Sequence, residues 1–343
     1  LGLVGNTLVT TDEAWRDLDG QLEALAPGRG AQRLREHSGA VYLQDDWTAG
    51  TAWAFNLGLR HEFARSRVRV DDASATKRIA IWAPSMSARK KLGADGQDVL
   101  RLSLARTYRA PDVEQFTLRP HINPQFPCSA NGRCAGNTAE FADQIGNPGL
   151  KAQTAIGLDL AFEHQGSHGR FLSVGVFSRL IANQVRQQIS LQPVAWAPVP
   201  RYVSQPVNIG TARAAGLEME ARFGLREVWP LAPAVAMATS WSLYRSRASN
   251  VAGPDNRLES QPWAHGKLSL QYKAQALPLQ VQAAWRWSPA TRVRLSEQQS
   301  TRLPQQRSLD ASAVWTLSPS SSLRLAASNL APSDEPTIQV FED

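Results

Sequence analysis

In 343 residues with a mean hydropathy of −0.32, no run approaches the roughly 18 apolar residues of a transmembrane helix, which excludes a helical membrane protein. The net charge is +7, but the 37 Lys and Arg residues are mostly scattered and form no long basic run or basic helix. This distribution argues against nucleic-acid binding, and it favours anionic lipid headgroups or a small anionic ligand as partners.

The first part of the chain alternates apolar and polar residues, as half-buried strands do. A strand at 1–10 and a polar stretch to residue 36 precede alternating segments at 37–47, 51–63 and 78–93. Small, flexible sequences, TAGT and GADGQ, follow the first and the last of these segments. Because such sequences form tight turns, we expect hairpins at both places.

The clearest alternation lies in the middle of the chain. Apolar residues keep one parity through 98–109 and again through 153–163. Between these two arms lies a loop, 110–151, of about forty residues. Loops of this length are uncommon in soluble domains, whereas membrane β-barrels join their strands by long loops on one side.

Seven further strands bring the expected number to about thirteen. In one of them, Glu218 and Glu220 share the face opposite the apolar residues, which suits a water-filled lumen or the solvent face of an ordinary sheet. The seven strands are expected at 170–185, 206–225, 234–246, 263–274, 279–288, 307–317 and 322–330.

The connectors alternate in length. The short ones are 48–50, 93–97, 165–169, 275–278 and 318–321, and the long ones are 10–36, 65–76, 110–151, 187–204, 248–261 and 289–305, with 224–233 of middling length. This sorting is typical of up-and-down strands with turns at one rim and loops at the other, and a Greek-key sandwich would not produce it. Because lipid cannot satisfy an open sheet edge, the sheet must close. The sequence therefore predicts an all-β, antiparallel, up-and-down transmembrane β-barrel, incomplete at thirteen strands.

Both cysteines of the chain, Cys128 and Cys134, lie in the loop sequence CSANGRC. A metal site would need more ligands nearby, and His121 alone does not supply them. We therefore expect no metal site. A small disulfide-closed loop in an oxidising compartment is the preferred interpretation, and free thiols are the alternative.

Six segments resemble, in the right order over residues 37–330, the barrel of TonB-dependent outer-membrane receptors, and they are most similar to the ferric-siderophore branch. In that branch the long loop after a YRAP-like motif often carries a cysteine pair. Gln153 stands where the family usually has Glu. The segments are VYLQDDW (41–47), LGLRHEF (57–63), ARTYRAPDVEQF (105–116), NPGLKAQTAIGLDLAFE (147–163), VNIGTARAAGLEMEARF (207–223) and LRLAASNL (323–330).

The resemblance implies a plugged barrel of about 22 strands in the outer membrane of a Gram-negative bacterium. Residues 1–343 would be its C-terminal part, with the N-terminal plug and the first barrel strands missing. Its implied partners are the TonB complex through that plug, outer-membrane lipids and lipopolysaccharide, and a small iron chelate, most simply a ferric siderophore. The chelate is transported without catalysis, and no resident cofactor is implied. The alternatives are a receptor for haem, cobalamin or another ligand, a passive porin, and a soluble β-rich secreted protein.

The long loops supply the candidate ligand-binding residues. Ferric siderophores are commonly anionic, and arginine offers planar, permanently charged donors to oxygen-rich anions. Solvated loop charge or contact with lipopolysaccharide phosphate is the alternative for each residue. Arg106 has the lipid-facing parity, where it could snorkel to phosphate unless a β-bulge resets that parity. The candidates are Arg109, Phe116, Arg119, His121 and Arg133 in one loop, and Trp196, Arg201 and Tyr202 in another.

Overall fold

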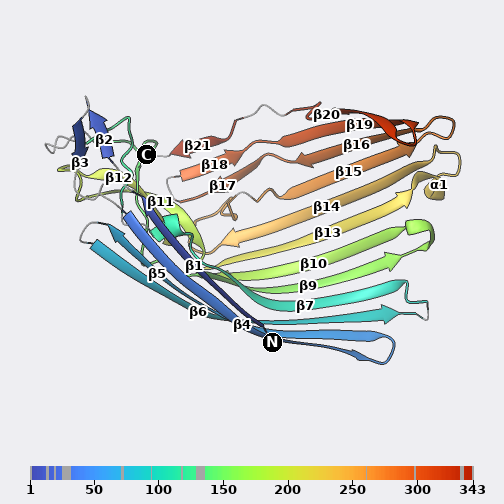
Figure 1. Cartoon of the computed structure of the whole chain (residues 1–343), viewed down its shortest axis with the longest axis horizontal. Helices are drawn as coiled ribbons and strands as arrows, with labels where there is room; N and C mark the ends of the chain where they lie inside the picture. Colours follow the sequence, from blue (N-terminus) through green and yellow to red (C-terminus); the bar gives the residue numbers. More distant parts are fainter. Residues whose placement is uncertain are drawn as a thin grey trace.

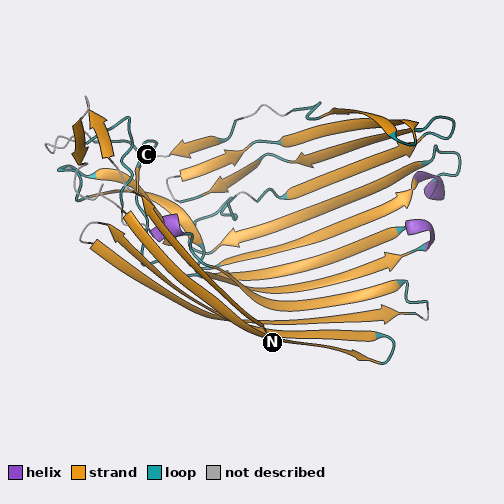
Figure 2. Ribbon diagram, in the orientation of Figure 1, coloured by secondary structure: helices purple, strands orange, loops and turns teal. Residues whose placement is uncertain are grey.

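The computed structural model describes most of the chain. The described ranges are 2–12, 15–18, 21–24, 32–70, 73–93, 95–116, 119–128, 136–259, 261–296, 299–332 and 336–341. Strands dominate, and the helical pieces are short (Figure 2). None of the helices in these ranges has the length and apolar character to cross a membrane.

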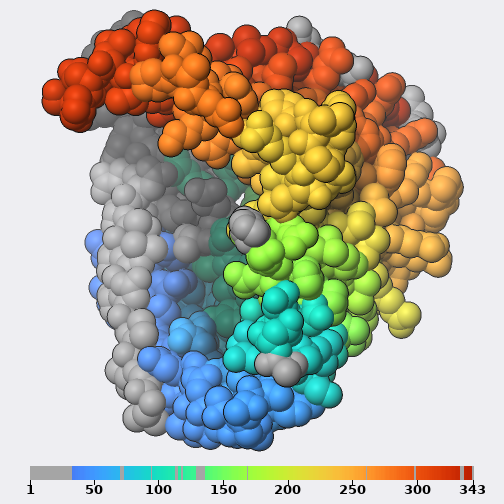
Figure 3. All heavy atoms as spheres, turned by 90° about the vertical axis from the view of Figure 1, so that its right-hand side faces the viewer, coloured from blue at the N-terminus to red at the C-terminus, as the bar shows by residue number. Residues whose placement is uncertain are grey.

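One antiparallel sheet of thirteen strands forms the body of the protein (Figure 1). The strands follow one another across the sheet in chain order, and seen end-on the wall curves from its blue strands through green and yellow to red (Figure 3). The sheet is open, with β1 at one edge and β20 at the other. The predicted incomplete up-and-down barrel is therefore confirmed. Its strands are β1 (Gly2–Asp12), β4 (Gln32–Ala49), β5 (Trp53–Val70), β6 (Ala73–Leu92), β7 (Asp98–Arg109), β9 (Gln153–Gln165), β10 (Phe171–Ala182), β13 (Ala212–Gly224), β14 (Val235–Ala248), β15 (Ala264–Lys273), β16 (Leu279–Ser288), β19 (Gln306–Ser318) and β20 (Ser321–Ala327).

The turns and the loops lie at opposite ends of the wall, as predicted. The hairpins β4–β5, β6–β7, β9–β10, β13–β14, β15–β16 and β19–β20 close at the right-hand end of Figure 1, and the long loops gather at the other end. The middling connector 224–233 lies on the turn side and holds the one-turn helix α1 (Leu225–Val228). We call the two ends the turn rim and the loop rim.

The predicted link at 65–76 is wrong. The β5–β6 ladder continues through it, pairing Arg67 with Thr76 and Arg69 with Ser74, and leaves only 71–72 outside the described residues. A strand of 18 residues exceeds the 9 to 11 that cross a bilayer, so this end projects past the apolar layer. Beyond that layer the outward face no longer has to be apolar: Arg65, Arg67 and Arg69 are exposed on the parity of Phe63, while Ser66 and Val68 are buried on the other face.

Four of the other predicted loops, 10–36, 110–151, 187–204 and 289–305, contain strands. Residues 187–204 include most of β11 (Val185–Gln192) and the start of β12 (Arg201–Asn208), so the strand predicted at 206–225 begins at Ala212 instead. The loop predicted at 289–305 contains β17 and β18. The smaller sheets at the loop rim are β11–β12–β8, with β8 at Asp143–Gln144, and β17 (Thr291–Arg294), β18 (Gln299–Leu303) and β21 (Ile338–Phe341); β2 (Trp15–Leu18) pairs with β3 (Gln21–Ala24).

The strand register gives the wall one apolar and one polar face. Leu57 pairs with Met86, Met86 with Leu104, and Leu104 with Leu158, so apolar side chains lie in rows across the strands. These four side chains are 40–47% exposed because no second layer covers the sheet. Glu218 pairs with Ser242 on the opposite, polar face. A single-layer wall with one uncovered apolar face is suited to lipid outside and water inside.

Aromatic side chains gather near both rims on the apolar face. Trp47 and Trp53 stack on Phe55 beside the β4–β5 turn, with ring centroids 5.3 and 5.5 Å apart. Near the loop rim, four tryptophans form a chain of ring contacts at 6.2–6.5 Å; they are Trp241, Trp263, Trp285 and Trp287. Aromatic girdles at the two lipid–water boundaries are a feature of outer-membrane barrels.

Candidate ligand-binding site

The loop rim is held together by a buried ion pair between Arg201 and Asp143. Both side chains are 0% exposed. The Arg201 guanidinium donates to both carboxylate oxygens, at 2.6 and 2.8 Å, and to the carbonyl of Phe126 at 2.8 Å. The indole N–H of Trp196 donates to the same carboxylate at 2.8 Å. This bidentate arrangement joins the end of the 110–151 loop to β12.

Strand pairing brings these groups together. β8 runs parallel to β12, with Val203 opposite Asp143, which places the carboxylate near Arg201 at the start of β12. Asn137 ties the same segments by donating to the carbonyls of Phe141 and Tyr202 and accepting from the Tyr202 N–H. Three stretches of the two longest loops therefore form one packed unit.

Hydrogen bonds keep the Asp143 carboxylate ionised. Burial by itself raises the pKa of this group, but donation from Arg201, Trp196 and the Asn123 N–H, with the charge of Arg201, outweighs it and holds the pKa below the ordinary 3.8. The pair is therefore charged at neutral pH.

The predicted ligand residues separate into two groups. Arg201 is fully buried, Trp196 donates to Asp143, and Phe116 is 4% exposed and packs with Leu34 and Val68. These three residues support the loops from within.

The other predicted residues have accessible side chains or lie outside the description. Arg109 and His121 are exposed, and Arg119 and Tyr202 are half-buried. The His121 backbone pairs with Gln144 of β8, which brings it to the packed loop unit. Arg133 lies outside the described residues.

The cysteine prediction is only partly covered by the description. Cys128 is 7% exposed and takes part in a disulfide. Its predicted partner, Cys134, lies outside the described residues, so the pairing itself stays a prediction.

A polar cavity of about 190 Å³ lies where β7 and β9 reach the loop rim. Arg109 and Gln153 are paired across these two strands, and both line the cavity. Ligand pockets usually measure roughly 300–1,000 Å³, so this cavity is smaller than a typical ligand pocket. It is lined by Arg109, Ala110, Pro111, Gln115, Gln153, Val185, Arg186, Gln187, Pro206 and Glu259.

The cavity wall contains a second ion pair, between Arg186 and Glu259, at 2.9 Å. Arg186 is 2% exposed and donates to the carbonyls of Arg257, Arg294 and Leu295, so it joins β11 to two other loops. Burial raises the pKa of Glu259, against the opposing charge of Arg186, and burial lowers the pKa of Arg186.

Sequence reasoning missed Arg186, Glu259 and Gln153 as cavity residues. Arg186 binds mainly backbone carbonyls, which leave no side-chain signal in a sequence. The sequence does carry one signal for this cavity, because Gln153 is neutral where the resembled family usually has Glu. In the structure the side-chain carbonyl of Gln153 accepts a hydrogen bond from the Val185 N–H at 3.2 Å.

Comparison with known proteins identifies the family. Among curated protein sequences, none matches the chain. The family model described as TonB dependent receptor-like, beta-barrel, matches residues 1–330. The chain belongs to the TonB-dependent receptor β-barrel family. This family comprises transport receptors and not enzymes.

Solved structures of other receptors share the fold at low sequence identity. The ferric-catecholate import receptor Fiu from Escherichia coli K12 gives a TM-score of 0.64 at 14% identity, over 96% of this chain and 47% of that one. The ferric enterobactin receptor PfeA from Pseudomonas aeruginosa gives 0.60 at 16% identity, over 96% and 54%. The alcaligin outer-membrane receptor FauA from Bordetella pertussis gives 0.57 at 13% identity, over 98% and 52%. The chain thus spans about half the length of these receptors.

The same fold also occurs in a copper transporter, OprC, with a TM-score of 0.58 at 14% identity. The same wall therefore occurs in proteins whose cargoes differ. In the part of the chain that the structure describes, no three His, Cys, Asp or Glu side chains lie together as a metal site would require.

Proposed function

We propose that the chain is the C-terminal barrel portion of an outer-membrane receptor that takes up a ferric siderophore by TonB-coupled transport. The observation that carries this proposal is the polar cavity at the loop rim, with the exposed guanidinium of Arg109 and the amides of Gln115 and Gln153 on its wall. The family and the siderophore receptors among its structural neighbours support it.

In this proposal the loops bind and the wall conducts. Arg109, on a strand end, offers planar donors to an anionic oxygen of the chelate, while Arg119, His121 and Tyr202 contact other parts of it. The buried pairs around Asp143 and Glu259 keep the loops in place, which lowers the ordering cost of binding. No bond of the cargo is broken, and the ferric chelate is cargo rather than a resident cofactor.

The proposed partners follow from the location. The TonB complex would act through a plug preceding this chain, and the apolar face of the wall would contact outer-membrane lipids and lipopolysaccharide. The ligand itself is a small iron chelate. Haem, cobalamin and copper are the competing cargoes for the same wall.

Iron-limited growth tests the proposal. The full-length receptor, expressed in a host without its own siderophore receptors, should restore growth on one class in a panel of catecholate, hydroxamate and hydroxycarboxylate iron chelates. Arg109→Ala should raise the chelate concentration that gives half-maximal uptake about tenfold, the loss of one charge-assisted contact.

The matched control is Arg170→Ala, which removes an exposed arginine at the turn rim, where it pairs with Glu227 at 3.3 Å. Uptake by this variant should equal that of the wild type. Growth on haem, cobalamin or copper alone, with no response to any iron chelate, would contradict the siderophore assignment. Equal uptake by Arg109→Ala and Arg170→Ala would remove Arg109 from the site.

A further inference from the structure

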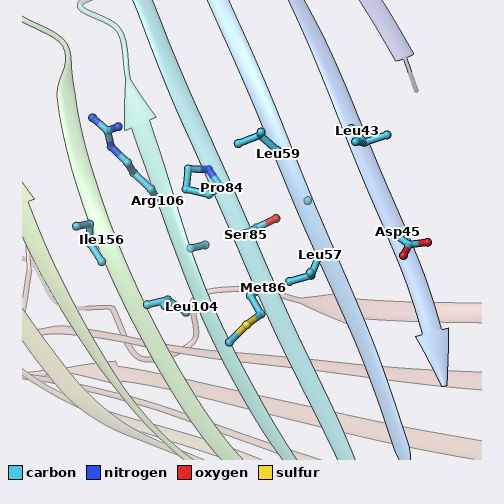
Figure 4. A pocket seen from close by; sticks show the side chains of 12 residues that line it. Leu43, Asp45, Leu57, Leu59, Pro84, Ser85, Met86, Leu104, Arg106 and Ile156 are labelled. Carbon is cyan, nitrogen blue, oxygen red and sulfur yellow. The ribbon is translucent and has the colours of Figure 1, made fainter. Parts of the chain in front are cut away.

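A groove of about 630 Å³ crosses the apolar face of the wall from β4 to β9 (Figure 4). Its walls are apolar side chains in two rows paired across the strands, and Figure 4 shows Leu59, Pro84 and Met86 in its middle. Two charged side chains also line it, Arg106 on β7 and Asp45 on β4, at opposite ends of the groove.

Proline causes a defect in the sheet at this point. The β6–β7 ladder ends at Ser85 and Ala105, one position before Pro84 would meet Arg106. The backbone N–H of Lys91 donates to the carbonyl of Ala52, on the β5 side of β6. The backbone groups of successive residues in a strand point alternately to its two neighbours, so the odd-numbered residues of β6 point to β5 and the even-numbered ones to β7. The nitrogen of Pro84 therefore points to β7. Because that nitrogen carries no hydrogen, the ladder bond to β7 cannot form.

Arg106 occupies the opened seam and stays on the apolar face. The β7–β9 register is unbroken from Asp98 to Arg109, so no bulge resets the parity of Arg106 in that pairing. Its guanidinium donates to the Trp82 carbonyl of β6 at 3.2 Å. In the part of the chain that the structure describes, no carboxylate lies within ion-pair distance of Arg106.

The groove calls for an occupant that is both apolar and anionic. Its leucine, isoleucine and methionine walls are stabilised by covering with hydrocarbon, and a small soluble anion would leave them uncovered. The guanidinium favours a phosphate, to which arginine donates two parallel hydrogen bonds. Asp45 repels an anion, so the phosphate is directed to the Arg106 end, which is the end nearer the loop rim.

We propose that this groove binds one phosphorylated lipid of the outer leaflet, with an acyl chain along the apolar rows and its phosphate on Arg106. The inference rests on the proposed outer-membrane location. The site differs from the loop cavity because it lies on the other face of the wall and uses no residue of that cavity.

Native mass spectrometry of the delipidated full-length receptor, titrated with lipid A, tests this inference. Arg106→Gln should weaken lipid A binding about tenfold, the loss of one charge-assisted pair. Leu104→Trp, which fills the groove and keeps the arginine, should weaken it to a similar extent. Phosphatidylcholine, whose headgroup has no net charge, should bind equally to the wild type and to Arg106→Gln.

The matched control is Lys90→Gln, which removes a cation from the same face of β6 outside the groove, where its ammonium lies 5.0 Å from the Trp53 ring centroid. Lipid A binding by this variant should stay within about twofold of the wild type. Equal binding by Arg106→Gln and wild type would overturn the inference, and so would displacement of lipid A by equimolar inorganic phosphate. Both outcomes leave the uptake proposal intact, whereas absence of the wild-type receptor from the outer membrane would overturn both.

Discussion

Replacing Asp143 with asparagine is expected to open the packed loop unit of the loop rim. The substitution keeps the shape of the side chain but leaves the guanidinium of Arg201 buried without its counter-charge. Removing one partner of a buried pair typically costs about 3–5 kcal/mol. We therefore expect the free energy of local opening to fall by that amount while the barrel strands stay unchanged.

Hydrogen exchange measures this opening directly. The N–H groups of Tyr202 and Ile145 are bonded within the unit, and both should lose protection in Asp143→Asn. The matched control is Asp112→Asn, which breaks an exposed pair with Arg109, and exposed pairs are worth roughly 0–1 kcal/mol. Unchanged protection of Tyr202 in Asp143→Asn would contradict the structural role of the pair.

The same pair sets a pH dependence. Because the pKa of Asp143 is below 3.8 in the folded loop, its stabilising contribution is present above that pH and is lost as the pH falls through the folded value. The hydrogen-exchange protection of the Tyr202 N–H in the wild type should therefore decrease as the pH falls below 3.8. The part of this decrease that comes from Asp143 should be absent in Asp143→Asn.

Gly216→Ala is expected to destabilise the barrel itself. A Cβ at Gly216 would lie 2.5 Å from the carbonyl oxygen of Leu243 and 2.5 Å from the ring of Phe177. Gly216 pairs with Phe177 on one side and Tyr244 on the other, and these two rings lie 6.0 Å apart on the polar face. Because one obstacle is backbone, a side-chain rotation cannot relieve the clash, and overpacking of this kind costs about 1–3 kcal/mol.

Denaturant unfolding of the full-length receptor in detergent measures this decrease in the free energy of unfolding. Gly175→Ala is the matched control, because it adds the same methyl group to the polar face of neighbouring β10, where the nearest atom is 3.4 Å away. That variant should stay within about 1 kcal/mol of the wild type. If the two variants were equally stable, the close packing described at Gly216 would be wrong.

The wall could be predicted from the sequence because lipid imposes a simple rule on each strand. Leu100, Leu102 and Leu104 share a parity because they share a face, and that rule holds for strands far apart in the chain. The rule does not extend past the apolar layer, where arginines take the outward positions of β5, and the sequence therefore predicts a link in place of the continuation of β5 to Val70.

The loop rim could not be predicted in this way. Arg201 and Asp143 are 58 residues apart, and nothing in either local sequence indicates that they meet. The sequence makes Arg201, Trp196 and Phe116 candidates for ligand contact on the same grounds as Arg109. In the structure Arg201, Trp196 and Phe116 pack inside the loops and stabilise them. Arg109 remains exposed beside a cavity whose other charged residues, Arg186 and Glu259, the sequence does not predict.

The central claim is that the apolar face of the wall contacts lipid and that all long loops leave it on the outer side of the membrane. Cysteine labelling on intact cells with a membrane-impermeant maleimide tests it, using Ala195→Cys in the loop between β11 and β12 and Ala276→Cys in the β15–β16 turn, both exposed positions. The account predicts labelling of Ala195→Cys on intact cells and of Ala276→Cys only after the outer membrane is permeabilised. Labelling of both on intact cells, or the reverse order, would contradict it.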